Sequence, residues 1–398
     1  MAYERSATGP VFYQCRGVFD GLGDSVRFGN GLLVADGRVL GVGPADTLAG
    51  AGVETRDLGD VVVVPGFVDA HTHVTIRPGE GDQHWQLVQP AVWQTIRGVP
   101  NLRRMLHSGV TTARIMTEEN DIDFEFQDAV ARGEVVGPRL LVSGPGLSPP
   151  GGHGSAAGGV AGVGPLREAI RKRAERGANH IKIFTTGGVS SVNSSLAESN
   201  YSGEEIAAIV DEAAKFGLRV SSHAHGGPGV DLAVANGVLS IEHGALLDEQ
   251  NIAAMVEHNT WLVLTNTILF HPEGIEQGDA RVPQIMAKVL AAREFATGNA
   301  AKIRAAGIRF ALGTDSMHGL YGYELVWVVE HGWSPAEALI AATRHGGELL
   351  GEQDTGVLRE GSRADFVVLP DDPCQDISVV QRVSDVYQAG QRVDRSAA

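Results

Sequence analysis

Six side chains able to bind a metal ion stand at or near the ends of apolar stretches of this chain: His71, His73, Lys182, His223, His243 and Asp315. Imidazole nitrogens and carboxylate oxygens are ligands for divalent ions such as Zn²⁺. His71 and His73 are two residues apart in VVVVPGFVDAHTHV, and side chains at that spacing on a strand lie on one side. Both rings could therefore hold one ion, although two surface histidines after a turn would give the same pattern.

Lys182 lies inside the apolar sequence HIKIF, where a charged amine is costly to bury. Two explanations stay open. The amine could pair with a neighbouring carboxylate. Alternatively, it could react with CO₂ to form a carbamate, an anionic bidentate ligand that can bridge two metal ions.

Taken together, these side chains predict a complete two-metal site. His71, His73 and Asp315 would hold one ion, His223 and His243 the other, and carbamylated Lys182 would bridge them. Two ions, for which we expect Zn²⁺, can share a water molecule, lower its pKa and hold the hydroxide as a nucleophile. Asp315 would then act as the catalytic base and afterwards as the acid.

Other histidines are candidates for substrate contacts at the same face. His153 lies in a glycine-rich segment, residues 144–164, whose composition suits a flexible linker or a catalytic lid. Its imidazole could stabilise a developing oxyanion, a catalytic role. His225 is two residues past His223 and points to the same side. Further candidates on neighbouring loops are Tyr201, His271 and His318. Arg114 is the nearest cation for a substrate carboxylate, and an ion pair that lines the barrel would explain this arginine equally well.

Strand-like segments that alternate with helical ones would position these residues. The strands are expected at 61–74, 110–116, 139–144, 180–188, 218–226, 240–244, 261–266 and 308–316. Eight such units predict an α/β fold, a (β/α)₈ TIM barrel, with its catalytic groups at the carboxyl ends of the strands. An open doubly wound sheet would require a glycine-rich turn after its first strand, and His71-Thr72-His73 stands there instead.

Both chain ends read as short strands and turns, with a hairpin at 31–43 around Asp36-Gly37. We therefore expect residues 1–60 and 356–398 to form one small β-sandwich domain, and residues 61–355 to form the barrel.

The composition narrows the range of partners. A formal net charge of −16 without a basic stripe argues against nucleic acid. The sequence shows no apolar run of membrane-spanning length and no signal-peptide pattern at its start. Only two cysteines occur, which fits a reducing compartment. We expect a cytoplasmic enzyme with a small-molecule substrate.

The motifs PGFVDAHTHV, IKIF, HAHG, IEHG and GTDS, in this order, resemble those of the amidohydrolase superfamily of metal-dependent hydrolases. The segment GVLREGSRADFVVLPDDP is similar to that family's closing β-sandwich segment. Within the family, the chain looks most like the imidazolonepropionase-related branch that has a lysine in strand four and includes Xaa-Pro dipeptidases. Relatives carry a Gly-Gly-His-Gly like that around His153, whereas the dipeptidases place a tyrosine where His225 stands.

The resemblance implies hydrolysis of an amide bond in a dipeptide, an N-acyl amino acid, or an aryl amide or carbamate. The alternative is opening of a cyclic amide or deamination, as imidazolonepropionase-type relatives perform. Such sites usually hold one metal and lack the bridging lysine, so Lys182 argues against it. A structural protein that has lost its ligands is a third possibility, which the six filled ligand positions oppose. The resemblance also implies a homo-oligomer.

Overall fold

The computed structural model describes residues 9–156 and 158–395 of an α/β protein. Eight parallel strands form two sheets, a three-stranded one in the order β10-β9-β8 and a five-stranded one in the order β11-β12-β13-β14-β15. These strands are β8 (Phe67–Thr72), β9 (Val110–Ile115), β10 (Arg139–Leu141), β11 (Ile181–Phe184), β12 (Val220–Ala224), β13 (Ser240–His243), β14 (Trp261–Leu264) and β15 (Phe310–Leu312). Nearly every residue in them is buried, as expected for parallel strands covered on both faces.

Backbone hydrogen bonds also join the two parallel sheets to each other. On one side, Leu147 donates to the carbonyl oxygen of Lys182 at 2.8 Å and accepts from the amide of Phe184 at 3.0 Å. On the other side, the amide of Asp315 donates to the carbonyl oxygen of His71 at 2.9 Å. The segments that carry the candidate ligands are therefore tied together at their carboxyl ends.

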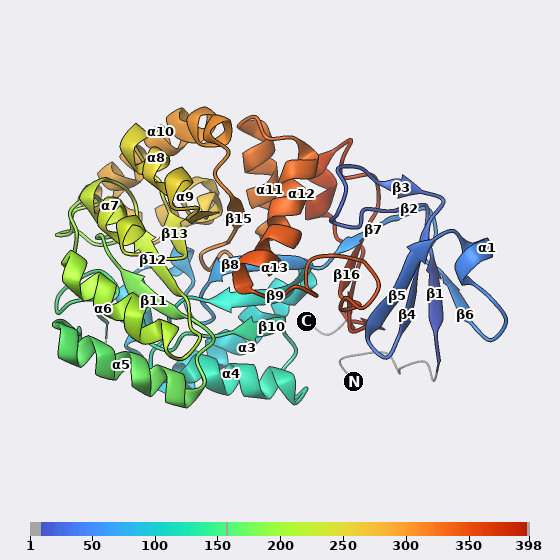
Figure 1. Cartoon of the computed structure of the whole chain (residues 1–398), viewed down its shortest axis with the longest axis horizontal. Helices are drawn as coiled ribbons and strands as arrows, with labels where there is room; N and C mark the ends of the chain where they lie inside the picture. The colour runs from blue at the N-terminus through green and yellow to red at the C-terminus, as the bar shows by residue number, and fades with distance from the viewer. Residues whose placement is uncertain (1–8, 157, 396–398) are drawn as a thin grey trace.

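Helices follow the strands and pack around them (Figure 1). The longer ones are α3 (Ala91–His107), α4 (Ile122–Ala131), α5 (Val163–Arg176), α6 (Gly203–Ala214), α7 (Gly227–Ala235), α8 (Glu249–Glu257), α10 (Pro283–Ala306), α11 (Tyr321–Glu330), α12 (Pro335–Ala342) and α13 (Arg344–Leu350). In α6, Ile206, Ile209 and Ala213 are buried at helical spacing, and Ser202 and Glu205 form a capping box at its start.

The segment 61–74, predicted as one barrel strand, is divided into two strands in different sheets. β7 (Val62–Pro65) pairs with β16 (Phe366–Leu369) and with β2 (Gly17–Val18). After Gly66 the chain continues as β8 beside β9. Position 66 has no room for a side chain, because a Cβ on Gly66 would lie 2.1 Å from Oγ1 of Thr111. A continuous apolar run could not reveal this division, since both strands are buried.

The two chain ends share one sheet, in the order β18-β17-β16-β7-β2-β3. It includes β3 (Arg27–Phe28), β17 (Asp385–Gln388) and β18 (Gln391–Arg392). Beside it lies a second sheet in the order β5-β4-β1-β6, formed by β1 (Val11–Gln14), β4 (Gly31–Ala35), β5 (Arg38–Gly43) and β6 (Glu54–Asp57) (Figure 1). The predicted hairpin at 31–43 is confirmed, with Asp36 and Gly37 at φ 50° and 73° in its turn.

No helix among the described residues is long and apolar enough to cross a membrane.

Candidate metal centre

One cavity gathers eight of the residues predicted from the sequence. It is lined by His71, His73, His153, Lys182, His223, His225, His243 and Asp315. They come from β8, β11, β12 and β13, from the residues directly after β8 and β12, and from the loops that follow β10 and β15. The strand register brings His223 beside Phe184, and His243 beside Ala224. The predicted catalytic face therefore has its ligand-capable residues in one place.

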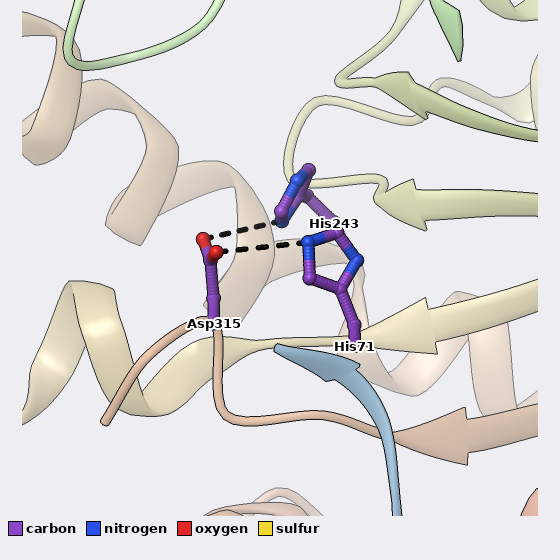
Figure 2. A group of neighbouring side chains, drawn as sticks. All are labelled: His71, His243 and Asp315. Carbon is purple, nitrogen blue, oxygen red and sulfur yellow. Dashed lines mark ion pairs between the residues drawn. The ribbon is translucent and has the colours of Figure 1, made fainter. Parts of the chain in front are cut away.

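Asp315 lies at the centre of three histidines. Its Oδ1 is 3.3 Å from Nε2 of His73 and 3.6 Å from Nε2 of His71, and its Oδ2 is 3.9 Å from Nδ1 of His243. Figure 2 shows Asp315 facing His71 and His243, and one ligand atom from each of these three residues lies within 4.8 Å of the others. A divalent ion with bonds of about 2.0–2.2 Å could join such atoms after a small movement.

The backbone at this centre is strained at three residues. His243 has φ 74°, Asp315 has φ 48° and Ser316 has φ 74°, all in the left-handed region that non-glycine residues rarely adopt. Residues held in this region cluster at functional sites, where the surrounding structure maintains the strain. Burial raises the pKa of Asp315, but the hydrogen bond and charge of His73 outweigh it and bring the pKa to about 2. Its carboxylate is therefore ionised at neutral pH.

His71 and His73 are each oriented by a partner behind the ring. Nδ1 of His71 donates to Oε2 of Glu242 at 2.7 Å, and Nδ1 of His73 donates to the carbonyl oxygen of Thr117 at 2.9 Å. Nε2 of each ring thereby faces Asp315. Such outer partners fix the tautomer and the orientation of metal-binding histidines.

Arg114 forms a buried ion pair with this same Glu242. Its Nη2 donates to the two carboxylate oxygens at 2.8 and 3.0 Å, and its Nε donates to the carbonyl oxygen of Ala70. Burial raises the pKa of Glu242, but the charge of Arg114 and the hydrogen bond from His71 hold it below its usual value. Arg114 does not line the cavity, so the ion pair, rather than a substrate clamp, accounts for this arginine.

His223 and His243 form the second pair, with ring centroids 4.6 Å apart. Nδ1 of His243 bonds to Oγ1 of Thr265 at 2.7 Å, and Nε2 of His223 donates to the carbonyl oxygen of Gly187 at 3.2 Å. Burial holds the pKa of both rings well below the usual value for histidine. Both are therefore neutral, the form in which histidine binds metals.

Lys182 is buried, with an exposed fraction of only 2%. Among residues 9–156 and 158–395 it forms no ion pair within 4.0 Å, and its Nζ lies 5.1 Å from the centre of the Phe184 ring. Burial lowers its pKa to about 8, although the charges of Glu242 and Asp315 act in the opposite direction. The neighbouring-carboxylate explanation therefore lacks a paired carboxylate, and the neutral amine, the form that reacts with CO₂, is accessible near neutral pH.

His153 and His225 face the cavity from beside His223. Nδ1 of His153 bonds to Oγ of Ser191 at 2.8 Å, which ties the loop after β10 to the loop after β11. His225 is 2% exposed, and neither of its ring nitrogens has a hydrogen-bond partner among the described residues. Burial lowers the pKa of His153 to about 4 and that of His225 to about 3, so both are neutral.

Three predicted substrate contacts do not line this cavity. The hydroxyl of Tyr201 donates to the carbonyl oxygen of Val160 at 2.7 Å, and Nε2 of His318 donates to the carbonyl oxygen of His73 at 2.6 Å. His271 packs its ring against Tyr323. His318 thus supports the backbone of the candidate ligand His73. The hydroxyl of Tyr201 is used in its bond to Val160.

The sequence reasoning missed other residues near the centre. The cavity also includes Gln83 and His84 of α2 (Gln83–Leu87) and an apolar wall formed by Ile76, Leu87, Phe184, Val189, Ile268, Leu269 and Ile275. Glu242 was missed as well, although a carboxylate within the apolar strand SIEH is a signal that could have been found. Gln83 and His84 follow a loop without any pattern.

This donor set fits divalent metal ions: imidazole nitrogens and an ionised carboxylate converge at the carboxyl ends of parallel strands. The fold and the site together define a metal-dependent enzyme. Residues 62–393 match the model of the amidohydrolase family. The chain belongs to the amidohydrolase family, whose members are metal-dependent hydrolases that act on small molecules, and its hydrolase relatives act on carbon–nitrogen bonds.

Individual relatives agree with this assignment. Ochratoxinase of Aspergillus niger is 31% identical over 366 residues, covering 83% of this chain and 75% of that protein. Imidazolonepropionase of Paracoccus denitrificans is 27% identical, covering 85% of this chain and 86% of that protein. A solved structure is also similar, that of a prolidase complexed with N-methylphosphonate-L-proline. Its sequence is 30% identical, the match covers 97% of this chain and 100% of the prolidase chain, and the TM-score is 0.86.

Proposed function

We propose that this protein is a binuclear metal-dependent amidohydrolase that cleaves the carbon–nitrogen bond of an apolar amide or carbamate. The main support is one cavity that joins the histidine and aspartate donors to an apolar wall. We further propose that the two parallel sheets close into the (β/α)₈ barrel and that the two chain ends form the small β-sandwich. The boundary between them would fall at Gly66, rather than after residue 60, because β7 pairs with β16.

The proposed ligand sets are those that the sequence predicts. His71, His73 and Asp315 would hold one ion, His223 and His243 the second, and a carbamate on Lys182 would bridge them. Zn²⁺ is the proposed metal because neutral imidazoles dominate the donor set. When bound, the two ions would supply an activated water and polarise the substrate carbonyl.

The side chains of this protein would perform the proton transfers. Asp315 is ionised and faces the centre, so its carboxylate would accept the proton of the attacking water and pass it to the leaving nitrogen. His153 is neutral, and if its Nδ1 accepts from the hydroxyl of Ser191, its Nε2 carries the proton that can be donated to the substrate oxygen.

The cavity wall favours a substrate that has a hydrophobic group and no carboxylate. Among the described residues that line it, Lys182 is the only lysine and there is no arginine. A carboxylate-bearing substrate would therefore bury its charge without a cationic side chain to pair with, which is unfavourable. Within the predicted range, aryl amides and aryl carbamates fit better than dipeptides or N-acyl amino acids.

A matched pair of substrates tests this proposal. N-benzoyl-phenethylamine and N-benzoyl-phenylalanine share the acyl and phenyl groups and differ by one carboxylate. With the zinc-loaded enzyme, we expect the neutral amide to have at least about tenfold higher kcat/KM, because the acid must bury an unpaired carboxylate. A tenfold difference corresponds to about 1.4 kcal/mol. Faster cleavage of the acid would overturn the proposed substrate class. Opening of a cyclic imidazolone without cleavage of either amide would favour the imidazolonepropionase-type alternative.

Residence in the cytoplasm and assembly into a homo-oligomer stay predictions from the sequence.

A further inference from the structure

A second cavity lies away from the metal centre and shares none of its lining residues. It lies between the end of α3, the start of α11 and the C-terminal segment that follows η4 (Ile377–Gln381). The charged or titratable side chains that line it are Arg104 and His107 of α3, Tyr323 of α11, and Arg382 and Arg395.

The charge of this cavity is opposite to that of the whole chain. Among the described residues that line it, three carry guanidinium groups and none carries a carboxylate, although the formal net charge of the protein is −16. Carboxyl groups outside the lining act electrostatically on its arginines, Asp385 on Arg395 and both Asp371 and Asp376 on Arg382, but none of those described forms an ion pair with them within 4.0 Å. Asp385 accepts from Nε of Arg392 at 2.8 Å, and Asp394 acts on His107 from outside the lining.

The guanidinium groups retain unused hydrogen-bond donors. Arg104, Arg382 and Arg395 form no ion pair within 4.0 Å among the residues that the structure describes. Arg395 donates Nη1 to the carbonyl oxygens of Val383 and Ser384, both at 2.7 Å, and Arg104 donates one bond to Asn101 at 3.3 Å. An arginine fork matches the oxygens of phosphate, sulfate and carboxylate groups.

His107 adds a polar atom that lacks a partner. Its Nε2 is buried and has no hydrogen-bond partner within the part of the chain that the structure describes. Burial lowers the pKa of His107, and the charges of Arg395 and Arg103 lower it further. The start of α11 borders the same cavity, and Leu320 at its N-cap supplies no side-chain cap. Backbone amides at a helix start favour anions, which adds to the effect of the arginines.

We propose that this cavity binds a small anion that carries phosphate, sulfate or carboxylate groups. Its three guanidinium groups would pair with the anion oxygens. The connection after β15 carries both Asp315 of the metal centre and Gly319 of this cavity. The proposed binding does not depend on the proposed substrate.

Isothermal titration of the full, metal-loaded chain with sulfate tests the site, because sulfate is a weak metal ligand. We expect saturable binding at one site per chain. In the double variant Arg104→Gln/Arg382→Gln, the affinity should fall at least about tenfold, because two of the three guanidinium charges are removed. Both side chains are exposed, so the fold should be unaffected. Arg359→Gln, at an exposed arginine outside the cavity, is the control and should bind like the parent protein.

Parallel titrations with phosphate and succinate identify the chemical source. Binding of sulfate and phosphate alone indicates a phosphate-type ligand, and binding of succinate alone indicates a dicarboxylate. Either result supports the proposal when the double variant weakens it. The proposal is overturned if none of the three anions binds saturably, or if the double variant binds as tightly as Arg359→Gln.

Discussion

Glu242 and His71 are joined by a hydrogen bond of 2.7 Å between two side chains that are almost completely buried. Behind them, Arg114 neutralises the carboxylate, so one arginine, one glutamate and one histidine form a chain that ends at the metal centre. The arrangement holds Nδ1 of His71 protonated and presents Nε2 to the cavity. The geometry of the centre therefore depends on a residue that does not itself face the proposed ions.

Glu242→Gln should destabilise the protein and weaken its metal binding. The change leaves Arg114 buried without a counter-charge, which costs about 3–5 kcal/mol. It also removes the partner that orients His71, which lowers metal affinity by about 10–100-fold. Urea unfolding and metal titration measure the two effects. Glu134→Gln, in an exposed pair with Arg132, is the control and should change neither. If the Glu242→Gln protein kept the parental stability, the proposed role of the Arg114–Glu242–His71 contacts would be contradicted.

Gly188→Ala should act like a substitution of His153 itself. A Cβ on Gly188 would lie 2.2 Å from Nε2 of His153, so the imidazole must move. The backbone of Gly188 lies outside the left-handed region, so alanine adds no conformational strain. We expect kcat to fall by about 10²-fold in both Gly188→Ala and His153→Ala, as for the loss of one oxyanion donor, with unchanged metal content. Full activity in Gly188→Ala would show that His153 has no catalytic role.

His225→Leu should separate stability from substrate recognition. His225 buries two ring nitrogens that have no hydrogen-bond partner among the described residues. Each unsatisfied buried polar group costs about 1–3 kcal/mol of folding free energy. Leucine removes that cost, so the melting temperature should stay the same or rise, while kcat/KM falls because a substrate contact is lost. Thermal unfolding and steady-state kinetics measure both. A lower melting temperature with unchanged kcat/KM would make His225 a structural residue.

Carbamylation of Lys182 in the metal-free protein should increase with pH. Only the neutral amine reacts with CO₂, and the pKa of Lys182 is about 8. The neutral fraction rises from about one-tenth at pH 7 to about nine-tenths at pH 9. At constant dissolved ¹³CO₂, the carbamate signal in ¹³C NMR should grow accordingly and be absent from Lys182→Met. Equal signals at pH 7 and pH 9 would contradict the assignment.

The sequence predicts most of the candidate centre because the candidate ligands follow apolar strands. His71, Lys182, His223 and His243 each belong to a short buried strand, and parallel strands bring their carboxyl ends to one face. Alternation along β12 also predicts that His223 and His225 share a side, and their rings are 4.8 Å apart. These inferences depend only on local patterns and on the direction of the strands.

Other features depend on contacts that no local pattern records. The division of 61–74 at Gly66 depends on pairing between β7 and β16, about 300 residues apart in sequence. Tyr201 and His271 lie on loops at the predicted face, yet their side chains turn to other partners. The bond between His153 and Ser191 likewise joins two loops whose composition does not predict their contact.

The metal content of the purified protein tests the central claim most directly. Inductively coupled plasma mass spectrometry of the zinc-loaded parent chain should give about two equivalents of zinc per chain, as a two-metal site requires. Lys182→Ala, which lacks the proposed bridge, should retain less than about one equivalent. A correctly folded parent protein that hydrolyses amides without bound metal would contradict the account.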